Sequence, residues 1–495
     1  MQNIGFNNEL YIERQSEEIS KRINEFGGKL YLEFGGKLYD DFHAARVLPG
    51  FAPDSKLRML MQLSERVEIV IVINASDIES NKMRGDIGIT YDTDVLRLID
   101  VFRDRGLYVG SVVIAQYNGQ PSVNVFKKRL EGLGMKVYLH YSIDGYPLDV
   151  AKVVSDEGFG KNEYIETTRP LVVVTAPGPG SGKMATCLSQ LYHENLRNIK
   201  AGYAKFETFP IWNLPLKHPV NLAYEAATAD LNDVNMIDPY HLEAYGSTAV
   251  NYNRDVESFP VLNAMFKKIS GKSPYKSPTD MGVNMVGFCI TDNDVCVKAS
   301  HDEIIRRYFK SLCDLKMGRV DMTAVNKIEM LMKQAGISPD DRAVVKAAFD
   351  RSEENGNEPA VAIQLKDGRI VTGKTSPLLG PASAALLNAC KALGDMDRPV
   401  KMIEPEVIEP IQKLKTTVLG NNNPRLHSDE VLIALAICAN TSDCAAVALS
   451  KLNELRGCEA HSTVILAQVD VDVYRKLGIN LTCEPKYNTN KLFQK

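Results

Sequence analysis

The residues with the clearest chemical pattern form a glycine-rich turn between an apolar run and a helical pattern. Aliphatic residues fill positions 171–174, and glycines recur over 178–182 before a lysine. Glycines let backbone N–H groups turn inward around an anion, and the start of a helix adds a favourable dipole. A lysine there supplies a point charge for a phosphate, as in a P-loop. We therefore predict a site for phosphate or another anion at Gly178, Gly180, Ser181, Gly182 and Lys183.

This segment departs from the P-loop pattern G-x-x-x-x-G-K-[ST] at two positions. Pro177 stands where the first glycine is required, and Met184 replaces the serine or threonine whose hydroxyl binds Mg²⁺. Neighbouring hydroxyls that could substitute are those of Thr175, Ser181 and Thr186. The alternative interpretation is a tight turn in which the glycines serve packing alone and Lys183 faces solvent.

A second glycine–lysine turn lies near the start of the chain. Gly35-Gly36-Lys37 follows an apolar run and precedes Arg46. Amino-acid kinases also bind phosphates with a Gly-Gly turn after a strand, so Lys37 and Arg46 are candidates to contact the same anion. The alternative is an ordinary polar loop, because such loops often gather charged residues.

The third region, residues 205–260, is rich in aromatic residues and in Asn, Asp and His. It contains few strong periodic patterns, and a long irregular stretch within a domain is usually functional. A carboxylate here could act as a base or bind a metal ion, and an arginine could neutralise phosphate charge. The candidate catalytic residues are Asp238, His241, Glu243, Arg254 and Asp255. The alternative is a buried, hydrogen-bonded network of loops.

Several metal-binding and nucleophile patterns are missing from the sequence. His193-Glu194 lacks the second histidine of H-E-x-x-H, and no P-C-x-x-C follows the H-x-E at His241. The nine cysteines all lie from Cys187 onward and form no C-x-x-C pair. We therefore predict no metal centre and no disulfides, and free thiols indicate a cytoplasmic protein.

The elements that must position these residues alternate between strand and helix in the first half. Apolar runs predict strands at 30–34, 67–73, 109–115, 136–141 and 170–175, separated by helical patterns. This alternation is typical of βαβ units and a mainly parallel sheet. Such sheets bind ligands at the carboxyl ends of their strands. The glycine-rich turn follows the last of these strands.

The second half begins with helical patterns alone and then returns to α/β. Around the turn Lys366-Asp367-Gly368 the sequence predicts a hairpin, followed by helices at 381–393 and 429–439 and strands at 463–468 and 479–483. We predict a multi-domain α/β fold in three parts. These are a large α/β domain at 1–299, a helical connector at 300–356 and a smaller α/β domain at 357–495.

One heptapeptide is duplicated. The residues EFGGKLY occur at 25–31 and again at 33–39. A single local duplication is not a solenoid period. We interpret it as a helix end and a strand end that share a turn sequence.

Composition restricts the class of protein. At about 150 residues per domain, 495 residues correspond to roughly three domains. Hydrophobic residues make up 44% and charged residues 24%, as in ordinary globular proteins. A formal charge of -4 argues against broad binding of nucleic acid. The first residues do not resemble a signal peptide, and no apolar run is long enough to span a membrane.

Four segments carry a resemblance to a known family. Residues 35–51, 169–194, 201–231 and 236–246 resemble the bacterial family known as domain of unknown function 1846, and the similarity covers essentially the whole chain. The resemblance implies a multi-domain α/β protein whose separate C-terminal unit is similar in topology to the cytidine-deaminase fold. Because the zinc ligands are missing from the sequence, we expect that unit to lack zinc. The resemblance implies no catalytic residues.

These observations lead to one functional hypothesis and two alternatives. The leading hypothesis is a cytoplasmic enzyme that binds a nucleotide or phosphorylated metabolite and performs phosphoryl transfer or ligation, with ATP and Mg²⁺ as the candidate cofactors. The first alternative is a nucleotide-independent enzyme that uses the glycine-rich loop as an anion clamp. The second is a non-catalytic, metabolite-binding regulatory protein. The expected partner is a small anionic molecule, and the chain could form a homo-oligomer.

Overall fold

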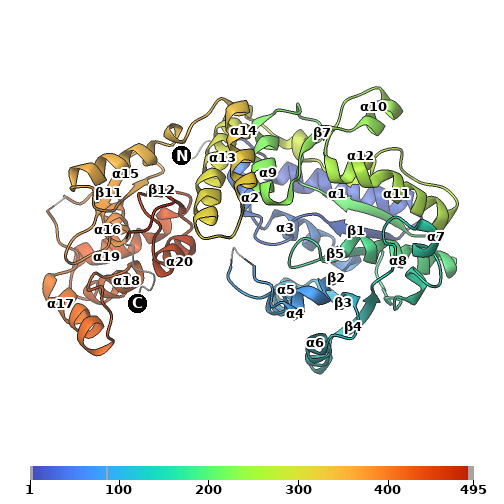
Figure 1. Ribbon diagram of the computed structural model, residues 1–495, viewed down its shortest axis with the longest axis horizontal. Coiled ribbons are helices and arrows are strands. Elements are labelled where there is room, and N and C mark those ends of the chain that lie inside the picture. The colour runs from blue at the N-terminus through green and yellow to red at the C-terminus, as the bar shows by residue number, and fades with distance from the viewer. Residues whose placement is uncertain (1–3, 85–86, 398, 489–495) are drawn as a thin grey trace. The chain divides into compact units, whose positions relative to one another are not determined.

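The computed structural model describes residues 4–84, 87–397 and 399–488, which fold into two compact units (Figure 1). The N-terminal unit comprises residues 4–225 and 233–300. The C-terminal unit comprises residues 226–232 and 301–488. Each unit is built around its own sheet. The mixed α/β class predicted from the sequence is therefore confirmed.

The N-terminal unit contains a seven-stranded sheet in the order β4-β3-β2-β5-β1-β6-β9. Every neighbouring pair in it is parallel. The strands are β1 (Leu30–Phe34), β2 (Val67–Asn74), β3 (Tyr108–Tyr117), β4 (Lys136–Tyr141), β5 (Leu171–Thr175), β6 (Gly202–Phe206) and β9 (Gly282–Val283). All eight residues of β2 are buried, as its unbroken apolar run predicts for a strand covered on both faces.

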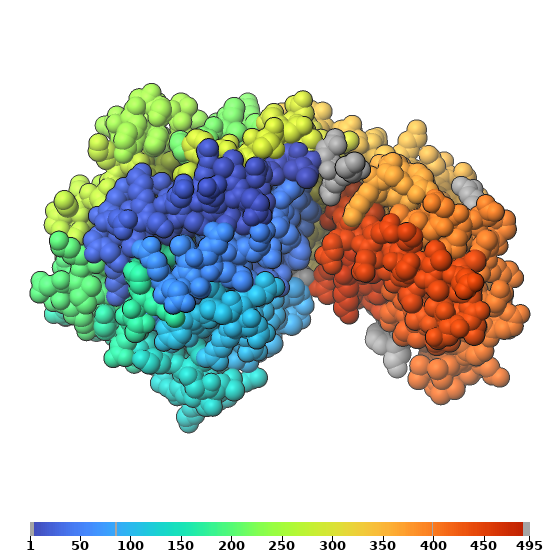
Figure 2. Space-filling view, turned by 180° about the vertical axis from the view of Figure 1, so that it is seen from behind, coloured from blue at the N-terminus to red at the C-terminus, as the bar shows by residue number. Residues whose placement is uncertain are grey.

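Helices cover both faces of this sheet. On one face, α8 (Lys183–Leu196) and α11 (Asn253–Ser270) pack in one apolar cluster against alternate residues of the central strands. The intervening strand residues point the opposite way and are also buried. Helix α1 (Asn8–Glu25) contacts β6 and β9, and α5 (Tyr91–Asp104) contacts β2 and β3. Helix α1, coloured dark blue in Figure 2, lies on the surface of this unit and packs beside α3 (Ser55–Gln62).

The expectation that residues 205–260 are largely irregular is wrong. They include α9 (Pro219–Ala227), α10 (Pro239–Tyr245), most of α11 and an antiparallel pair, β7 (Asn235–Ile237) with β8 (Val250–Tyr252). Most of these elements are too short to produce a readable period. Pro260 also interrupts the sequence pattern of α11 without ending the helix. Prolines occupy the first turns of α9 and α10, where a missing N–H costs nothing.

The C-terminal unit has a four-stranded sheet in the order β11-β10-β12-β13. The predicted hairpin is present as β10 (Ala360–Gln364) and β11 (Ile370–Lys374). Strand β12 (Glu459–Ser462) is antiparallel to β10 and parallel to β13 (Asn480–Cys483). The predicted strand at 463–468 is wrong, since β12 ends before it and helix α20 (Gln468–Leu477) begins at its last residue.

Strand β12 was missed because it contains charged and polar residues. Glu459 accepts from Arg306 at 2.8 Å and from Arg342 at 2.6 Å, and His461 is fully buried. The Glu459 side chain is 21% exposed, and a carboxylate at this depth is tolerated when it is paired and hydrogen-bonded in this way. These ion pairs connect helix α13 (Asn293–Lys316) and the residue before α15 (Ala343–Glu354) to the sheet. Helix α14 (Met322–Ala335) lies between them in the chain.

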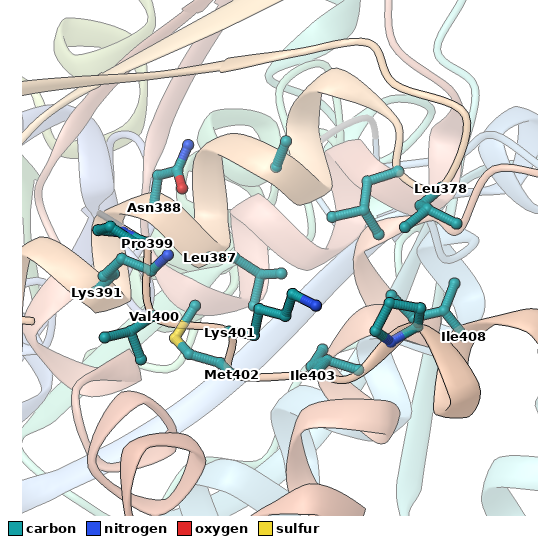
Figure 3. A pocket seen from close by; sticks show the side chains of 13 residues that line it. Leu378, Leu387, Asn388, Lys391, Pro399, Val400, Lys401, Met402, Ile403 and Ile408 are labelled. Atoms are coloured by element: carbon teal, nitrogen blue, oxygen red, sulfur yellow. The ribbon is translucent and has the colours of Figure 1, made fainter. Parts of the chain in front are cut away.

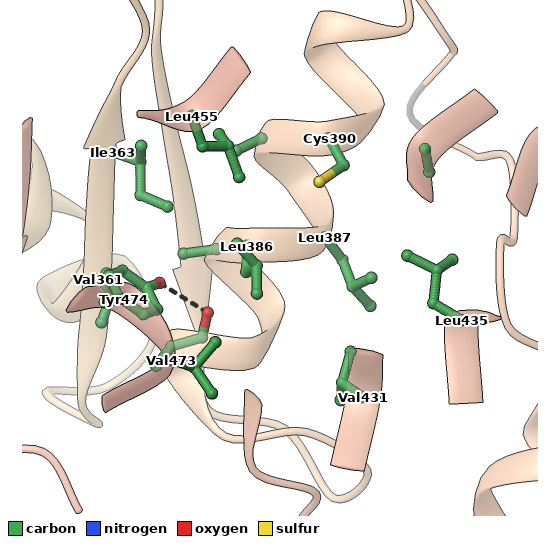
Figure 4. Packing of buried hydrophobic residues seen from close by; sticks show 14 of the residues in the cluster. Val361, Ile363, Leu386, Leu387, Cys390, Val431, Leu435, Leu455, Val473 and Tyr474 are labelled. Atoms are coloured by element: carbon green, nitrogen blue, oxygen red, sulfur yellow. Dashed lines mark hydrogen bonds between the residues drawn. The ribbon is translucent and has the colours of Figure 1, made fainter. Parts of the chain in front are cut away.

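Helix α16 (Pro381–Leu393) is central to the core of the C-terminal unit. Its Leu386, Leu387 and Cys390 lie in one apolar cluster with β10 and with α18 (Ser428–Cys438) (Figure 4). The Tyr474 hydroxyl of α20 donates to the Ala382 carbonyl at 2.8 Å, which holds α20 against α16. The remaining helices of this part are α17 (Pro405–Lys413) and α19 (Asp443–Ser450). No helix among the described residues is both long and apolar enough to cross a membrane.

The contact between β11 and α16 generates a prediction. A Cβ at Gly373 would lie 2.0 Å from the Ala385 backbone nitrogen, so Gly373→Ala must push the helix away. We expect a loss of about 2–3 kcal/mol in the free energy of unfolding, measured by urea titration. At Gly380 the nearest atom to a new Cβ would be 3.6 Å away, so the control Gly380→Ala should lose about 1 kcal/mol or less. Equal stability of the two variants would contradict this packing.

Candidate functional site

The order of the strands places a topological switch point at the carboxyl edge of the seven-stranded sheet. Strands β2 and β5 are neighbours, but the chain leaves them in opposite directions, from β2 toward β3 and from β5 through α8 toward β6. Ligands of open α/β sheets bind at such switch points, outside the carboxyl ends of the strands. The glycine-rich segment 176–182 directly follows β5 and therefore lies at this position.

The glycine-rich segment is held by close backbone approaches. Gly180 and Gly182 have φ values of +75° and +95°, and a Cβ at Gly178 would lie 2.2 Å from the Tyr91 hydroxyl. The Asn74 amide, at the end of β2, donates to the Gly180 carbonyl at 3.2 Å. Gly182 is the N-cap of α8 without a side-chain hydrogen bond, so the first N–H groups of the helix need partners from elsewhere.

Two hydroxyls of this segment are buried without a described partner. Ser181 and Thr186 are each 1% exposed. Within residues 4–84, 87–397 and 399–488, no group forms a hydrogen bond with Ser181 Oγ or Thr186 Oγ1. Buried polar groups normally have partners, so such hydroxyls indicate room for a ligand or ordered water.

Lys183 lies at the first position of α8 and is partly buried. Burial lowers its pKa, the Glu33 carboxylate opposes this shift, and the nearby charges of Lys205 and Arg254 add to it. The side chain is therefore only partly exposed, and Glu33, Lys205 and Arg254 are near enough for their charges to act on it.

Glu33 and Lys205 form the centre of a buried charged cluster. They are cross-strand partners on β1 and β6 and therefore project from the same face of the sheet. Tyr31 and Tyr203, two residues earlier on each strand, lie in the apolar cluster with α8 and α11. The charged pair thus faces the first turns of these two helices. The Tyr203 hydroxyl donates to Glu33 Oε2 at 2.6 Å.

The Lys205 ammonium contacts two carboxylates and a phenol. It forms an ion pair with Glu207 Oε1 at 2.9 Å and another with Asp255, in the first turn of α11, and it donates to the Tyr252 hydroxyl. These contacts use all three of its N–H donors. Burial opposes its charge, but the carboxylates outweigh burial, and the pKa of Lys205 stays well above the ordinary lysine value.

Glu207 is the group in this cluster that can exchange a proton near neutral pH. Burial raises its pKa to about 7, although the Lys205 ammonium acts in the opposite direction. A Cβ at Gly282 on β9 would lie 3.1 Å from Glu207 Oε2, so this glycine leaves room for the carboxyl group. A carboxyl group of this kind has the properties of a general acid or base.

The structure brings some of the predicted site residues together. Lys183, Arg254 and Asp255 belong to the cluster around Lys205. The Arg254 side chain is 56% exposed and forms an ion pair with Asp233 at 3.1 Å. This places a partly exposed cation at the outer side of the cluster.

Of the other candidates, His241 and Glu243 lie on α10 and Asp238 is its N-cap residue. Asp238 caps α10, accepting from the N–H groups of Tyr240 and His241, and its other oxygen accepts from Thr279 of α12 (Pro278–Met281). His241 lies 3.8 Å from Asp280 of the same α12, and Glu243 is exposed. The described contacts of Asp238 and His241 thus hold α10 against α12 rather than the Lys205 cluster.

The turn that carries Lys37 is anchored beside β6, and Arg46 lies on the helix that follows it, α2 (Phe42–Val47). A Cβ at Gly35 would lie 2.7 Å from the Phe206 carbonyl oxygen, so β1 and β6 end in close contact. The buried Lys56 ammonium pairs with Asp41 at 2.7 Å and donates to the Lys37 carbonyl at 3.1 Å. The Lys37 side chain itself is exposed.

The sequence assigned no role to Glu33, Lys205 or Glu207. Their one visible signal is a charged residue near the carboxyl end of a buried, mainly apolar strand. No group of three or more His, Cys, Asp or Glu side chains within the described part of the chain is arranged to hold a metal ion.

Comparisons with known proteins cover almost the whole chain. Residues 4–336 match the model described as "Domain of unknown function DUF1846, N-terminal", and residues 340–493 match its C-terminal counterpart. A UPF0371 protein of Streptococcus pyogenes serotype M5 (strain Manfredo) is 59% identical over 495 residues, 100% of both chains. A UPF0371 protein of Streptococcus thermophilus (strain CNRZ 1066) has the same identity and coverage.

The raised pKa of Glu207 predicts a pH-dependent stability. The folded protein keeps the proton up to about pH 7, whereas an ordinary glutamate loses it near 4.5. The contribution of Glu207 to stability should therefore fall as the pH rises between these values, by up to about 3 kcal/mol, while buried His140, whose pKa is lowered to about 4, contributes with the opposite sign. Glu207→Gln should flatten this part of the stability profile in urea titrations at several pH values. The exposed control Glu243→Gln should keep the wild-type profile, and identical profiles of the wild type and Glu207→Gln would contradict the burial argument.

Proposed function

The chain belongs to the DUF1846 family, and we propose that in it the carboxyl edge of the seven-stranded sheet binds a nucleotide or another phosphorylated metabolite. The observation that carries this proposal is the position of Lys183. It combines a helix N-terminus, a glycine turn with positive φ and a lysine whose pKa is lowered by burial. The helix N-terminus and the glycine turn favour an anion, and an anion beside Lys183 would favour the charged form that burial disfavours.

The buried Ser181 hydroxyl supports the same ligand. It lies within the glycine-rich loop and has no described hydrogen-bond partner, so a phosphate oxygen would satisfy it. The N–H groups at the start of α8 would bind the remaining phosphate oxygens, and Lys183 would balance their charge. The strand–turn–helix thus acts like a P-loop, although Met184 replaces the usual Mg²⁺-binding hydroxyl.

The charged cluster behind the loop would supply the chemistry. In phosphoryl transfer a substrate hydroxyl attacks the terminal phosphorus of ATP, the bond to the β-phosphate oxygen breaks, and ADP leaves. Glu207 would accept the proton of the attacking hydroxyl, and Lys205, fixed by Asp255, would hold Glu207 in place. Arg254 would stabilise the charge of the transferred group, and Mg²⁺ bound with ATP would share that task.

The two alternatives use the same residues differently. In a nucleotide-independent enzyme, the loop would clamp a phosphate or carboxylate of the substrate while Glu207 moves a proton. In a regulatory protein, ligand binding would occur without turnover. The methionine at position 184 favours both alternatives over an ordinary P-loop enzyme, because the Mg²⁺-binding hydroxyl of that position is replaced.

We further propose that the C-terminal unit has the topology of the cytidine-deaminase fold. The hairpin β10–β11 followed by α16 supports this likeness, as does the strand order β11-β10-β12-β13. No catalytic role is assigned to this unit by the likeness.

Lys183→Ala tests the proposed phosphate site. A screen of thermal unfolding with ATP, ADP, inorganic phosphate and sugar phosphates should identify a ligand that raises the melting temperature of the wild-type protein. The variant should bind that ligand about tenfold more weakly or worse, because a charge-assisted hydrogen bond is lost. Lys161→Ala is a matched control, since Lys161 also follows a glycine turn but is exposed.

Two results would count against the proposal. One is the absence of stabilisation by any phosphorylated compound at millimolar concentration. The other is an equal effect of Lys183→Ala and Lys161→Ala on the affinity. If a ligand binds, an assay of its turnover by wild type and by Glu207→Gln separates the enzyme from the regulatory protein.

A further inference from the structure

The C-terminal unit contains an open pocket that the proposed function does not use. Its volume is about 300 Å³. It lies between α16 and the segment 399–408, which leads into α17. Apolar side chains from both walls converge on it, as Figure 3 shows for Leu378, Leu387, Val400, Met402, Ile403 and Ile408.

The floor of the pocket is part of the unit's core. Leu387, Met402, Ile403 and Ile408 are between 4% and 8% exposed and belong to the main apolar cluster. The space is left because α16 presents the small side chain of Ala384 there. The pocket is therefore a feature of the packed core rather than a gap between loose surface side chains.

The polar groups of the pocket are two lysines and an amide. Asn388 already uses its amide nitrogen to donate to the Thr372 carbonyl at 2.9 Å. Lys391 is partly buried on α16, and burial lowers its pKa. Lys401 is at the rim and pairs with Glu404 at 3.8 Å. No aspartate or glutamate is among the residues that line the pocket where the structure describes it.

An apolar floor with cationic side chains at its edge is complementary to a molecule with an aliphatic chain and one negative charge. An anion beside Lys391 would favour the charged form of this lysine, which burial disfavours. A volume of 300 Å³ equals the share of about ten water molecules in the liquid. This is the scale of a medium-chain carboxylate.

We propose that this pocket binds a medium-chain aliphatic carboxylate such as octanoate, with its chain on Leu387 and Met402 and its carboxylate beside Lys391. The ligand would stabilise the C-terminal unit by filling the space between α16 and segment 399–408. This site is independent of the glycine-rich loop, so its failure would leave the proposed phosphate site untouched.

Calorimetric titration of the full-length protein with butanoate, hexanoate and octanoate tests the proposal. We expect one site per chain and an affinity that rises about fourfold with each added methylene, because each one buries apolar surface. Octan-1-ol, which has the same chain without the charge, should bind more weakly than octanoate. Octylamine should bind more weakly still, because its ammonium would meet Lys391.

Variants identify the site of binding. Lys391→Met should lower the affinity for octanoate by about tenfold, the loss of one charged contact, and leave that for octan-1-ol unchanged. Ala384→Phe should abolish binding by filling the pocket. Lys476→Met, which removes an exposed lysine elsewhere in the same unit, is the matched control.

The proposal is overturned if octanoate does not bind at millimolar concentration, or if its affinity does not depend on chain length. Binding of several molecules per chain that Lys391→Met leaves unchanged would also overturn it, since that is the behaviour of a detergent on a surface. If Ala384→Phe fails to fold, the chain-length series and Lys391→Met still decide the question.

Discussion

The ion pairs of Lys205 with Asp255 and Glu207 are the interaction on which the candidate site depends. An ammonium group that is 6% exposed cannot remain charged without partners, because burial of an unpaired charge costs far more than a protein's net stability. Asp255 and Glu207 satisfy it and join the end of β6 to the start of α11. Lys205 also acts on Lys183 through its charge, so the same cluster sets the electrostatics at the start of α8. Burial shifts the pKa values of Glu207 and Lys183, and the charge of Lys205 acts on both groups.

Both units use buried charge, but in different ways. In the C-terminal unit, Glu459 is neutralised by Arg306 and Arg342, and these contacts hold helices against a sheet. In the N-terminal unit, one ammonium meets two carboxylates, and burial leaves Glu207 with a raised pKa. In the C-terminal unit the charges of Glu459, Arg306 and Arg342 are paired, and their role is structural. The arrangement in the N-terminal unit leaves a proton that can move, and it lies at the end of the sheet where ligands of this fold class bind.

The fold could be predicted where the local pattern agrees with the packing. The apolar run of β2 is buried on both faces, and the glycine-rich turn follows β5 as expected. Prediction failed where a strand buries polar groups, as β12 does with His461 and Ser462. The duplicated heptapeptide also shows that packing, and not the local sequence alone, decides the conformation of a segment. Its first copy ends α1 with Gly27 at φ +80°, whereas its second ends β1 with Gly35 against the Phe206 carbonyl, so neighbouring strands decide its conformation.

The amino-acid sequence by itself determined the alternation of strands and helices and the glycine–lysine turn, because these depend on residues close together in the chain. Only the tertiary structure decided which charges meet. Lys205 and Asp255 are fifty residues apart, and Glu33 faces Lys205 because β1 and β6 pair in one register. The tertiary structure also gives different roles to Asp255 and Asp238, two carboxylates of the same region that the sequence could not distinguish. Asp255 pairs with Lys205, whereas Asp238 caps a helix. The physical reason is that a pKa is set by burial and by neighbouring charges, and both arise from contacts that no local pattern encodes.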